Sequence, residues 1–303
     1  MQSKARSVST VVLAILVIAA LIMIFVIPFI GFDMVNPIVK AQQARIEKFT
    51  AENNPQAPLL TFTVWLVSFF FPFWVTMSLI AGLAALVLIP AYARGEKWTR
   101  GLLLILYAIP SIGGAYMIVP WMNFIGSQKG GFPPAVLIMT VGLIPYFAIL
   151  LSEKVTKFEK LVNVLVFLML GVTAAENFAN GHAAFRILYG HPARPLFAEG
   201  IAITFFGWLT LWVAMVLLIL SIYLLGLKKK SGYYAALIGG LVTLVGSSAT
   251  HYVRHATLDY LFGALMGLSI VVMLLIPSFK KVLLGESDVK PAVVDPPVVV
   301  AEE

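Results

Sequence analysis

Long apolar runs constrain the fold of this sequence more than any other feature. Eight such runs are separated by short polar segments, and the first of them, residues 8–32, is 25 residues long. About 20 apolar residues in a helix span the ~30 Å hydrocarbon core of a bilayer. Only 12% of the residues are charged, about half the share found in soluble domains. The sequence therefore predicts an all-α bundle of about eight transmembrane helices, a multi-pass integral membrane protein.

The predicted bundle forms a single transmembrane domain over residues 1–284. Its helices are expected at residues 8–32, 61–92, 101–124, 135–151, 161–178, 200–227, 233–252 and 258–277. Between the first two helices, residues 33–58 are expected to form an external amphipathic segment. Residues 179–199 are expected to form an external loop. The proline-containing acidic tail, residues 285–303, is expected to be a disordered cytoplasmic segment.

The distribution of lysine and arginine predicts the orientation of the bundle. An even number of spans puts both termini on one side, and fourteen of the 21 basic residues fall on that side. Since basic loops remain in the cytoplasm, we expect cytoplasmic N and C termini and a location in the plasma membrane. The net charge of +7 then reflects membrane orientation. Membrane lipids are the expected partners, and nucleic acid is not.

The histidines gather on the opposite, outer side of this predicted topology. They form two groups that bracket the expected helices at residues 200–227 and 233–252. Because one of these helices runs inward and the next runs outward, the two groups can meet in space. The chain has four histidines, namely His182, His191, His251 and His255.

The second histidine group lies in a stretch rich in charged residues at a helix boundary, where charge is costly and commonly functional. His251, His255 and Asp259 are spaced four residues apart, so they share one face of a helix. His255 with Asp259 would suit phosphoryl chemistry, as a nucleophile and the carboxylate that orients it. His182 would then protonate the leaving oxygen.

Arginines near both histidine groups would hold the phosphate, because the guanidinium group binds phosphate oxygens with two parallel hydrogen bonds. The candidates are Arg254, Arg186 and Arg194. Together with the histidines, they predict a substrate-binding site for a phosphate group at the outer face.

Residues 254–267, Arg-His-Ala-Thr-Leu-Asp-Tyr-Leu-Phe-Gly-Ala-Leu-Met-Gly, resemble the last motif of the type 2 phosphatidic acid phosphatase superfamily, which includes sphingomyelin-synthase-like transferases. That motif is His, three residues, Asp, three residues, Gly. Gly181-His182 resembles the end of the family's Pro-Ser-Gly-His motif, with Ala179 and Asn180 at the proline and serine positions. The resemblance covers the C-terminal part of the chain only. It implies a lipid-phosphate phosphatase or phosphotransferase without a cofactor, with His255 as the nucleophile and His182 as the acid.

Two other interpretations stay open on the residues alone. Cysteine is absent, which excludes cysteine-ligated metals, but His251, His255 and His182 are alternative ligands for a divalent metal or a haem. Alternatively, the polar residues order the helix ends, and Gly263 and Gly267 allow close helix packing. The protein would then be a non-catalytic accessory subunit of a complex, a helix-packed oligomer or a transporter. Whether it is an enzyme therefore also stays open.

Overall fold

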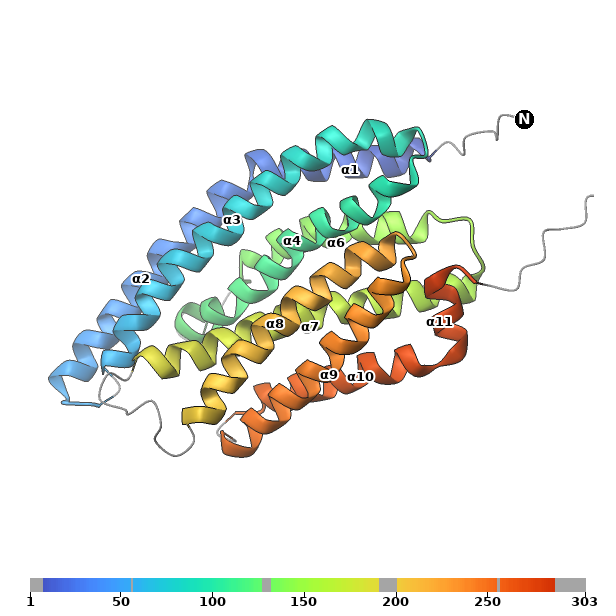
Figure 1. Ribbon diagram of the computed structural model, residues 1–303. Helices are drawn as coiled ribbons and strands as arrows, with labels where there is room; N and C mark the ends of the chain where they lie inside the picture. The colour runs from blue at the N-terminus through green and yellow to red at the C-terminus, as the bar shows by residue number, and fades with distance from the viewer. Residues whose placement is uncertain (1–7, 56, 127–131, 191–200, 255–256, 287–303) are drawn as a thin grey trace, which may run out of the picture.

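The structure, a computed structural model, describes residues 8–55, 57–126, 132–190, 201–254 and 257–286. All regular elements in these ranges are helical, which confirms the predicted all-α class (Figure 1). Residues 287–303 of the predicted tail lie outside the described ranges. The elements are α1 (Thr10–Phe25), α2 (Ile27–Ala51), α3 (Ala57–Ala93), α4 (Lys97–Trp121), the π-helical turn η1 (Met122–Gly126), α6 (Ala135–Leu151), α7 (Lys157–Gly190), α8 (Ile201–Gly226), α9 (Lys230–Val253), α10 (Asp259–Leu275) and α11 (Pro277–Leu284).

Two pairs of helices are each joined by a sharp bend. The axes of α1 and α2 meet at 43° around Val26, just before Pro28, whose missing N–H interrupts the helical hydrogen-bond ladder. The axes of α10 and α11 meet at 81°, where Pro277 begins the shorter helix. The helix expected within residues 33–58 is longer than predicted, because it begins at Ile27 and packs along α3.

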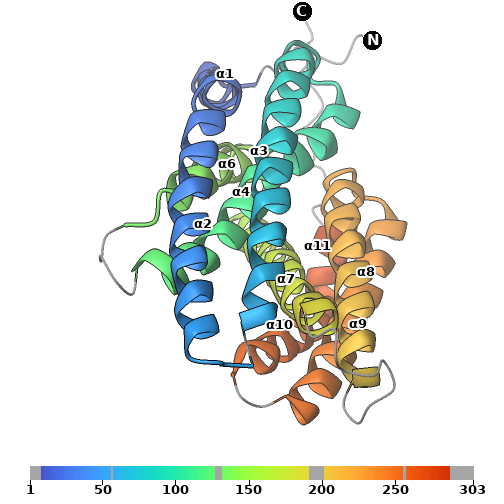
Figure 2. The ribbon, with the colours of Figure 1, turned by 90° about the vertical axis from the view of Figure 1, so that its left-hand side faces the viewer.

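Helix α7 lies at the centre of the bundle. It contacts α3, α4, α6, α8, α10 and α11. In Figure 2, α2 and α3 form one side of the bundle, α8 and α9 form the other, and α7 lies between them. Its C-terminal end is therefore surrounded by other helices, which makes it a suitable support for a buried site.

The extent of α7 corrects one sequence-based prediction. We expected this helix to end at residue 178 and an external loop to follow, but residues 179–190 continue the helix. The sequence misled because Asn177, Asn180, Gly181 and His182 together resemble the end of a helix. In the bundle these residues are buried against neighbouring helices, and that packing outweighs their weak helical preference.

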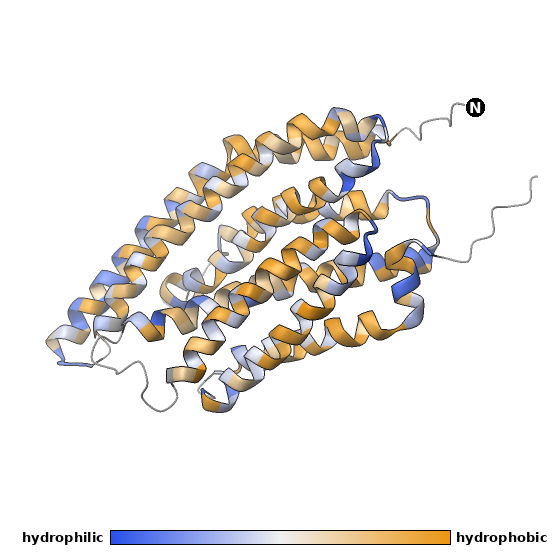
Figure 3. Ribbon diagram, in the orientation of Figure 1, coloured by the Kyte–Doolittle hydropathy of each residue, from blue (hydrophilic) through white to orange (hydrophobic). Residues whose placement is uncertain are grey.

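Apolar residues predominate along most helices, as Figure 3 shows. Large side chains such as Val87, Val213 and Val245 are more than half exposed. Helices α3, α4, α7, α8 and α9 are each long and apolar enough to cross a membrane, and the two bent pairs raise the number to seven. The described chain thus has five to seven apolar helices that can span a bilayer. Helix α6, with 17 residues, is shorter than these.

The end of the bundle that holds the start of α1 and helix α11 also holds the α3–α4, α6–α7 and α8–α9 loops (Figure 1). Arg100 ties these loops together. Its guanidinium group pairs with Glu153 and donates a hydrogen bond to the carbonyl oxygen of Gly226. One half-buried arginine therefore joins α4 to the α6–α7 loop and to the end of α8.

Gly263 and Gly267 lie where α10 crosses its neighbours at close range. A β-carbon at Gly267 would lie 2.7 Å from the backbone nitrogen of Leu244 and 2.8 Å from the carbonyl oxygen of Gly240. Both are backbone atoms of α9, so the contact cannot be relieved by rotating a side chain. Glycine at this position lets the two helices approach closely.

We predict that Gly267→Val destabilises the bundle, because α10 must move away from α9 to accommodate the added carbons. The expected loss is about 1–3 kcal/mol, measured as a lower thermal unfolding midpoint in detergent. Gly171→Ala is the matched control, since a β-carbon there meets no atom within 4 Å. Equal midpoints for Gly267→Val and the control would contradict the prediction.

Candidate functional site

A polar cavity of about 440 Å³ lies at the end of the bundle where α7 ends and α10 begins. Helices α3, α4, α7 and α10, the turn η1 and the segment between α9 and α10 all contribute to its wall. Its polar lining consists of Thr63, Tyr116, Asn123, Glu176, Asn180, His182, Arg186, Arg254, Thr257, Asp259 and Tyr260. In a chain with so few charged residues, a cavity with four of them marks this end as the candidate site.

The additional turns of α7 explain why so many of these groups meet. Glu176, Asn180, Ala183 and Arg186 recur every three or four residues, so they form one stripe along the helix. All four line the cavity. In the loop predicted after residue 178, Asn180, Ala183 and Arg186 would have had no fixed position relative to Glu176.

His182 lies on the same helix and is buried, with 7% of its surface exposed. The hydroxyl oxygen of Tyr116 lies 2.6 Å from Nδ1 of His182, and the two groups share a hydrogen bond. The rings of Phe70 and Phe178 pack around the imidazole, with centroids 5.4 Å and 6.4 Å away. The bond to Tyr116 fixes the ring orientation and leaves Nε2 as the nitrogen available to a ligand.

Asn180 connects α7 to the start of α10. Its Nδ2 donates hydrogen bonds to Oε1 of Glu176 at 3.1 Å and to the carbonyl oxygen of Asp259 at 3.2 Å. In return, the hydroxyl of Tyr260 donates to the carbonyl oxygen of Asn180 at 3.2 Å. These bonds hold Asp259 and Tyr260 at the cavity wall.

Arg254, just beyond the end of α9, is held by Tyr260. Its Nη1 donates to the hydroxyl oxygen of Tyr260 at 3.4 Å, and its guanidinium carbon lies 5.8 Å from the centre of that ring. Stacking on an aromatic ring orients an arginine without neutralising it. The positive charge of Arg254 therefore stays available to a ligand.

Arg186 faces the same cavity from α7, and its positive charge and that of Arg254 repel each other. Within the described ranges, neither arginine forms an ion pair with a carboxylate, and the buried Nε of Arg186 has no hydrogen-bond partner. Glu176 and Asp259 line the same cavity, so its charges balance overall. Recognition of an anion would thus depend on the directed hydrogen bonds of the arginines, more than on net charge.

Of the residues predicted from the sequence, His182, Arg186, Arg254 and Asp259 line this one cavity. They come from the two groups on either side of α8 and α9. The predicted nucleophile His255, together with His191 and Arg194, lies outside the described residues. His251, in the last turn of α9, is half-buried, is not among the cavity-lining residues, and has an Nδ1 atom without a hydrogen-bond partner.

The alternative metal site stays a prediction. Among the described residues, no three side chains of the histidine, cysteine, aspartate or glutamate type are grouped closely enough to hold a metal ion. The proposed ligand set includes His255, which is not among them.

No sequence pattern indicated Tyr116, Tyr260 or the side-chain role of Asn180 as parts of the site. Tyr116 is far from His182 along the chain, in an apolar helix, and no local pattern marks it. Asn180 and Tyr260 directly precede or follow residues that we did single out, Gly181 and Asp259. Asn180 and Tyr260 could therefore have been found as sequence neighbours of these residues. Nothing in the sequence predicts the hydrogen bond from Tyr260 to Asn180.

Comparison with protein-family models, with curated protein sequences and with solved structures gave no match. The class is therefore defined by the fold: an all-helical protein with five to seven apolar helices that can span a membrane and a polar cavity at one end. The resemblance to lipid phosphatases depends on the quoted motif residues.

We predict that Tyr116→Phe destabilises the protein by about 1–3 kcal/mol, because it leaves the buried Nδ1 of His182 without its partner. Thermal or denaturant unfolding in detergent measures this loss, and the ring nitrogen chemical shifts of His182 should change in nitrogen-15 NMR. Tyr234→Phe, at an exposed tyrosine, is the control and should change neither quantity. An unchanged His182 spectrum in Tyr116→Phe would contradict the prediction.

Proposed function

We propose that this protein is an integral membrane enzyme that binds a lipid phosphate in the polar cavity and hydrolyses or transfers its phosphate group. The observation that carries the proposal is the meeting of Arg186 and Arg254, both without ion-pair partners among the described residues, with His182 and Asp259 around one cavity. Arginines are the preferred partners of phosphate. Two half-buried arginines without ion-pair partners among the described residues are suited to bind an anion.

The proposed chemistry follows from the resemblance and from the contacts of His182. His255, four residues before Asp259, would form the bond to phosphorus while the lipid oxygen leaves. His182 would give a proton to that oxygen through Nε2, since Tyr116 occupies Nδ1. Asp259, held at the wall through Asn180, would orient His255.

We further propose that all eight apolar segments cross the plasma membrane, with α6 and each bent pair counted as one span. Both termini are then cytoplasmic, and the polar cavity opens at the outer face. The support is the positive-inside rule, because the basic loops at residues 94–100, 154–160 and 228–230 share the end of the bundle that holds α11 (Figure 1).

The absence of cysteine makes this orientation directly testable. We predict that Thr257→Cys, at the cavity end, reacts with a membrane-impermeant thiol reagent on intact cells. Lys229→Cys, in the α8–α9 loop, should react only after the membrane is permeabilised. The opposite labelling pattern would contradict the orientation, and labelling of both on intact cells would contradict the spans between them.

We predict that purified protein releases phosphate from a panel of lipid phosphates and that His255→Ala abolishes the release. Arg186→Gln and Arg254→Gln should each reduce it by about tenfold or more, the effect of losing one charge-assisted hydrogen bond to phosphate. Arg94→Gln is the control, because that arginine is exposed at the other end of the bundle.

No release by the folded wild-type protein would contradict the proposed activity. The visible spectrum and metal content of the same sample would then test the haem and metal alternatives. Release that persists in His255→Ala would show that the reaction does not use this nucleophile.

A further inference from the structure

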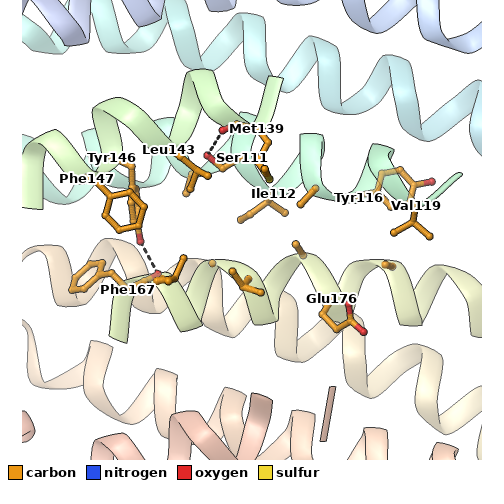
Figure 4. Close-up of a pocket in the computed structure, with 17 residues that line it drawn as sticks. Ser111, Ile112, Tyr116, Val119, Met139, Leu143, Tyr146, Phe147, Phe167 and Glu176 are labelled. Atoms are coloured by element: carbon orange, nitrogen blue, oxygen red, sulfur yellow. Dashed lines mark hydrogen bonds between the residues drawn. The ribbon is translucent and has the colours of Figure 1, made fainter. Parts of the chain in front are cut away.

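A second cavity, of about 230 Å³, lies between α4, α6 and α7 (Figure 4). Its lining is almost entirely apolar. Away from Tyr116 and Glu176, the polar side chains in its wall are bonded within the wall itself: the hydroxyl of Ser111 donates to the carbonyl oxygen of Met139 at 3.3 Å, and the hydroxyl of Tyr146 donates to that of Phe167 at 3.0 Å. Apart from one end, this apolar cavity therefore offers a ligand hydrocarbon contacts and no hydrogen bonds.

The apolar cavity adjoins the polar cavity. Tyr116, Val119, Glu176 and Ala179 line both. Figure 4 shows Tyr116, Val119 and Glu176 together at one end of the apolar cavity. Together, the two cavities are polar at one end, where the two arginines lie, and apolar along the rest. A lipid with an anionic head group has the same arrangement of polar and apolar parts.

Small residues keep the apolar cavity open. Ala108, Ala115 and Ala175 line it together with Gly171. A β-carbon built at Gly171 would meet no atom within 4 Å, so this glycine does not serve close helix packing as Gly267 does. Space left unfilled beside it is space for a ligand.

The dimensions of the apolar cavity suit one hydrocarbon chain. Its α7 wall runs from Phe167 to Ala179, a rise of about 18 Å at 1.5 Å per residue. One leaflet of a bilayer with a ~30 Å hydrocarbon core is about 15 Å deep. Val119 and Val172 in its lining are 48% and 41% exposed, so part of the cavity wall lies at the surface that would face the hydrocarbon of the proposed membrane.

We infer that the apolar cavity holds the single hydrocarbon chain of a lipid phosphate whose head group lies between Arg186 and Arg254. This inference rests on the proposed function and names its substrate class. The hydrocarbon chain of the ligand gains little free energy when it moves from the bilayer into the cavity, because lipid tails are as apolar as the cavity wall. The cavity therefore selects by fit, and lipids whose chain matches the α4–α6–α7 space are favoured over short or bulky ones.

The test uses Gly171→Leu, which fills the apolar cavity without touching either arginine. Leucine forms helices better than glycine and finds open space here, so the variant should fold, and a thermal unfolding curve checks that it does. The probes are dodecyl phosphate, butyl phosphate and inorganic phosphate, each titrated calorimetrically into protein in one non-ionic detergent.

We expect the wild type to bind dodecyl phosphate more tightly than butyl phosphate or inorganic phosphate. Gly171→Leu should weaken dodecyl phosphate binding about tenfold, the order expected when added carbons compete with the ligand for the same space, and leave the other two probes unchanged. Gly171→Ala should have a smaller effect. Val213→Phe, which adds bulk on the exposed face of α8, should have none.

The failures of the two proposals differ in this experiment. If Arg186→Gln weakens all three probes but Gly171→Leu weakens none, the head-group site stands and the chain site is overturned. If wild-type protein binds dodecyl phosphate no better than inorganic phosphate, the ligand is free phosphate and the chain site is again overturned. If the wild type binds no phosphate probe, the proposed function fails and the inference fails with it.

Discussion

The unbroken course of α7 past residue 178 is the feature on which the rest of this site depends. A helix keeps its backbone hydrogen-bonded inside the bundle, where a loop would have to find other partners. By staying helical to Gly190, α7 presents Glu176, Asn180 and Arg186 as one stripe facing α4 and α10. The same continuity buries His182 against Tyr116.

Several polar side chains around the polar cavity are held in place by hydrogen bonds to one another. Tyr116 orients His182, Tyr260 orients Arg254, and Asn180 ties Asp259 to Glu176. Among the described side chains that line the polar cavity, only Arg186 has a buried polar atom, its Nε, without a hydrogen-bond partner. A network that satisfies its other members and leaves a guanidinium nitrogen unsatisfied is typical of a site that a ligand completes.

The two cavities together restrict the kind of ligand that the site suits. A purely polar cavity would suit any small anion, and a purely apolar one would suit any hydrocarbon. Tyr116 and Glu176 belong to the walls of both, so the polar and the apolar cavity lie next to each other. That arrangement favours an amphiphilic substrate.

Part of the fold and of the candidate site could be predicted from the sequence. The other part could not, for physical reasons. The lengths of the apolar runs gave the helical class, because the hydrocarbon core requires helices, and chain reversal at residues 227–230 placed the groups around His182 and Arg254 at one end. The end of α7 was predicted wrongly, since asparagine, glycine and histidine favour a helix end only where tertiary packing does not outweigh them. The count of eight spans is a finer statement than the five to seven that length and composition support.

By itself, then, the sequence determined an all-helical membrane-type bundle and the pair of segments that would supply a site. Periodicity and spacing relate only residues within one predicted helix. Because the helix was expected to end at residue 178, they did not relate His182 to Arg186, and they cannot relate His182 to Tyr116 on another helix. Which helices face one another depends on the tertiary structure, and with it the hydrogen bond between Tyr116 and His182, the open space beside Gly171 and the wall that the two cavities share. These features arise from side chains on different helices, and only packing brings them together.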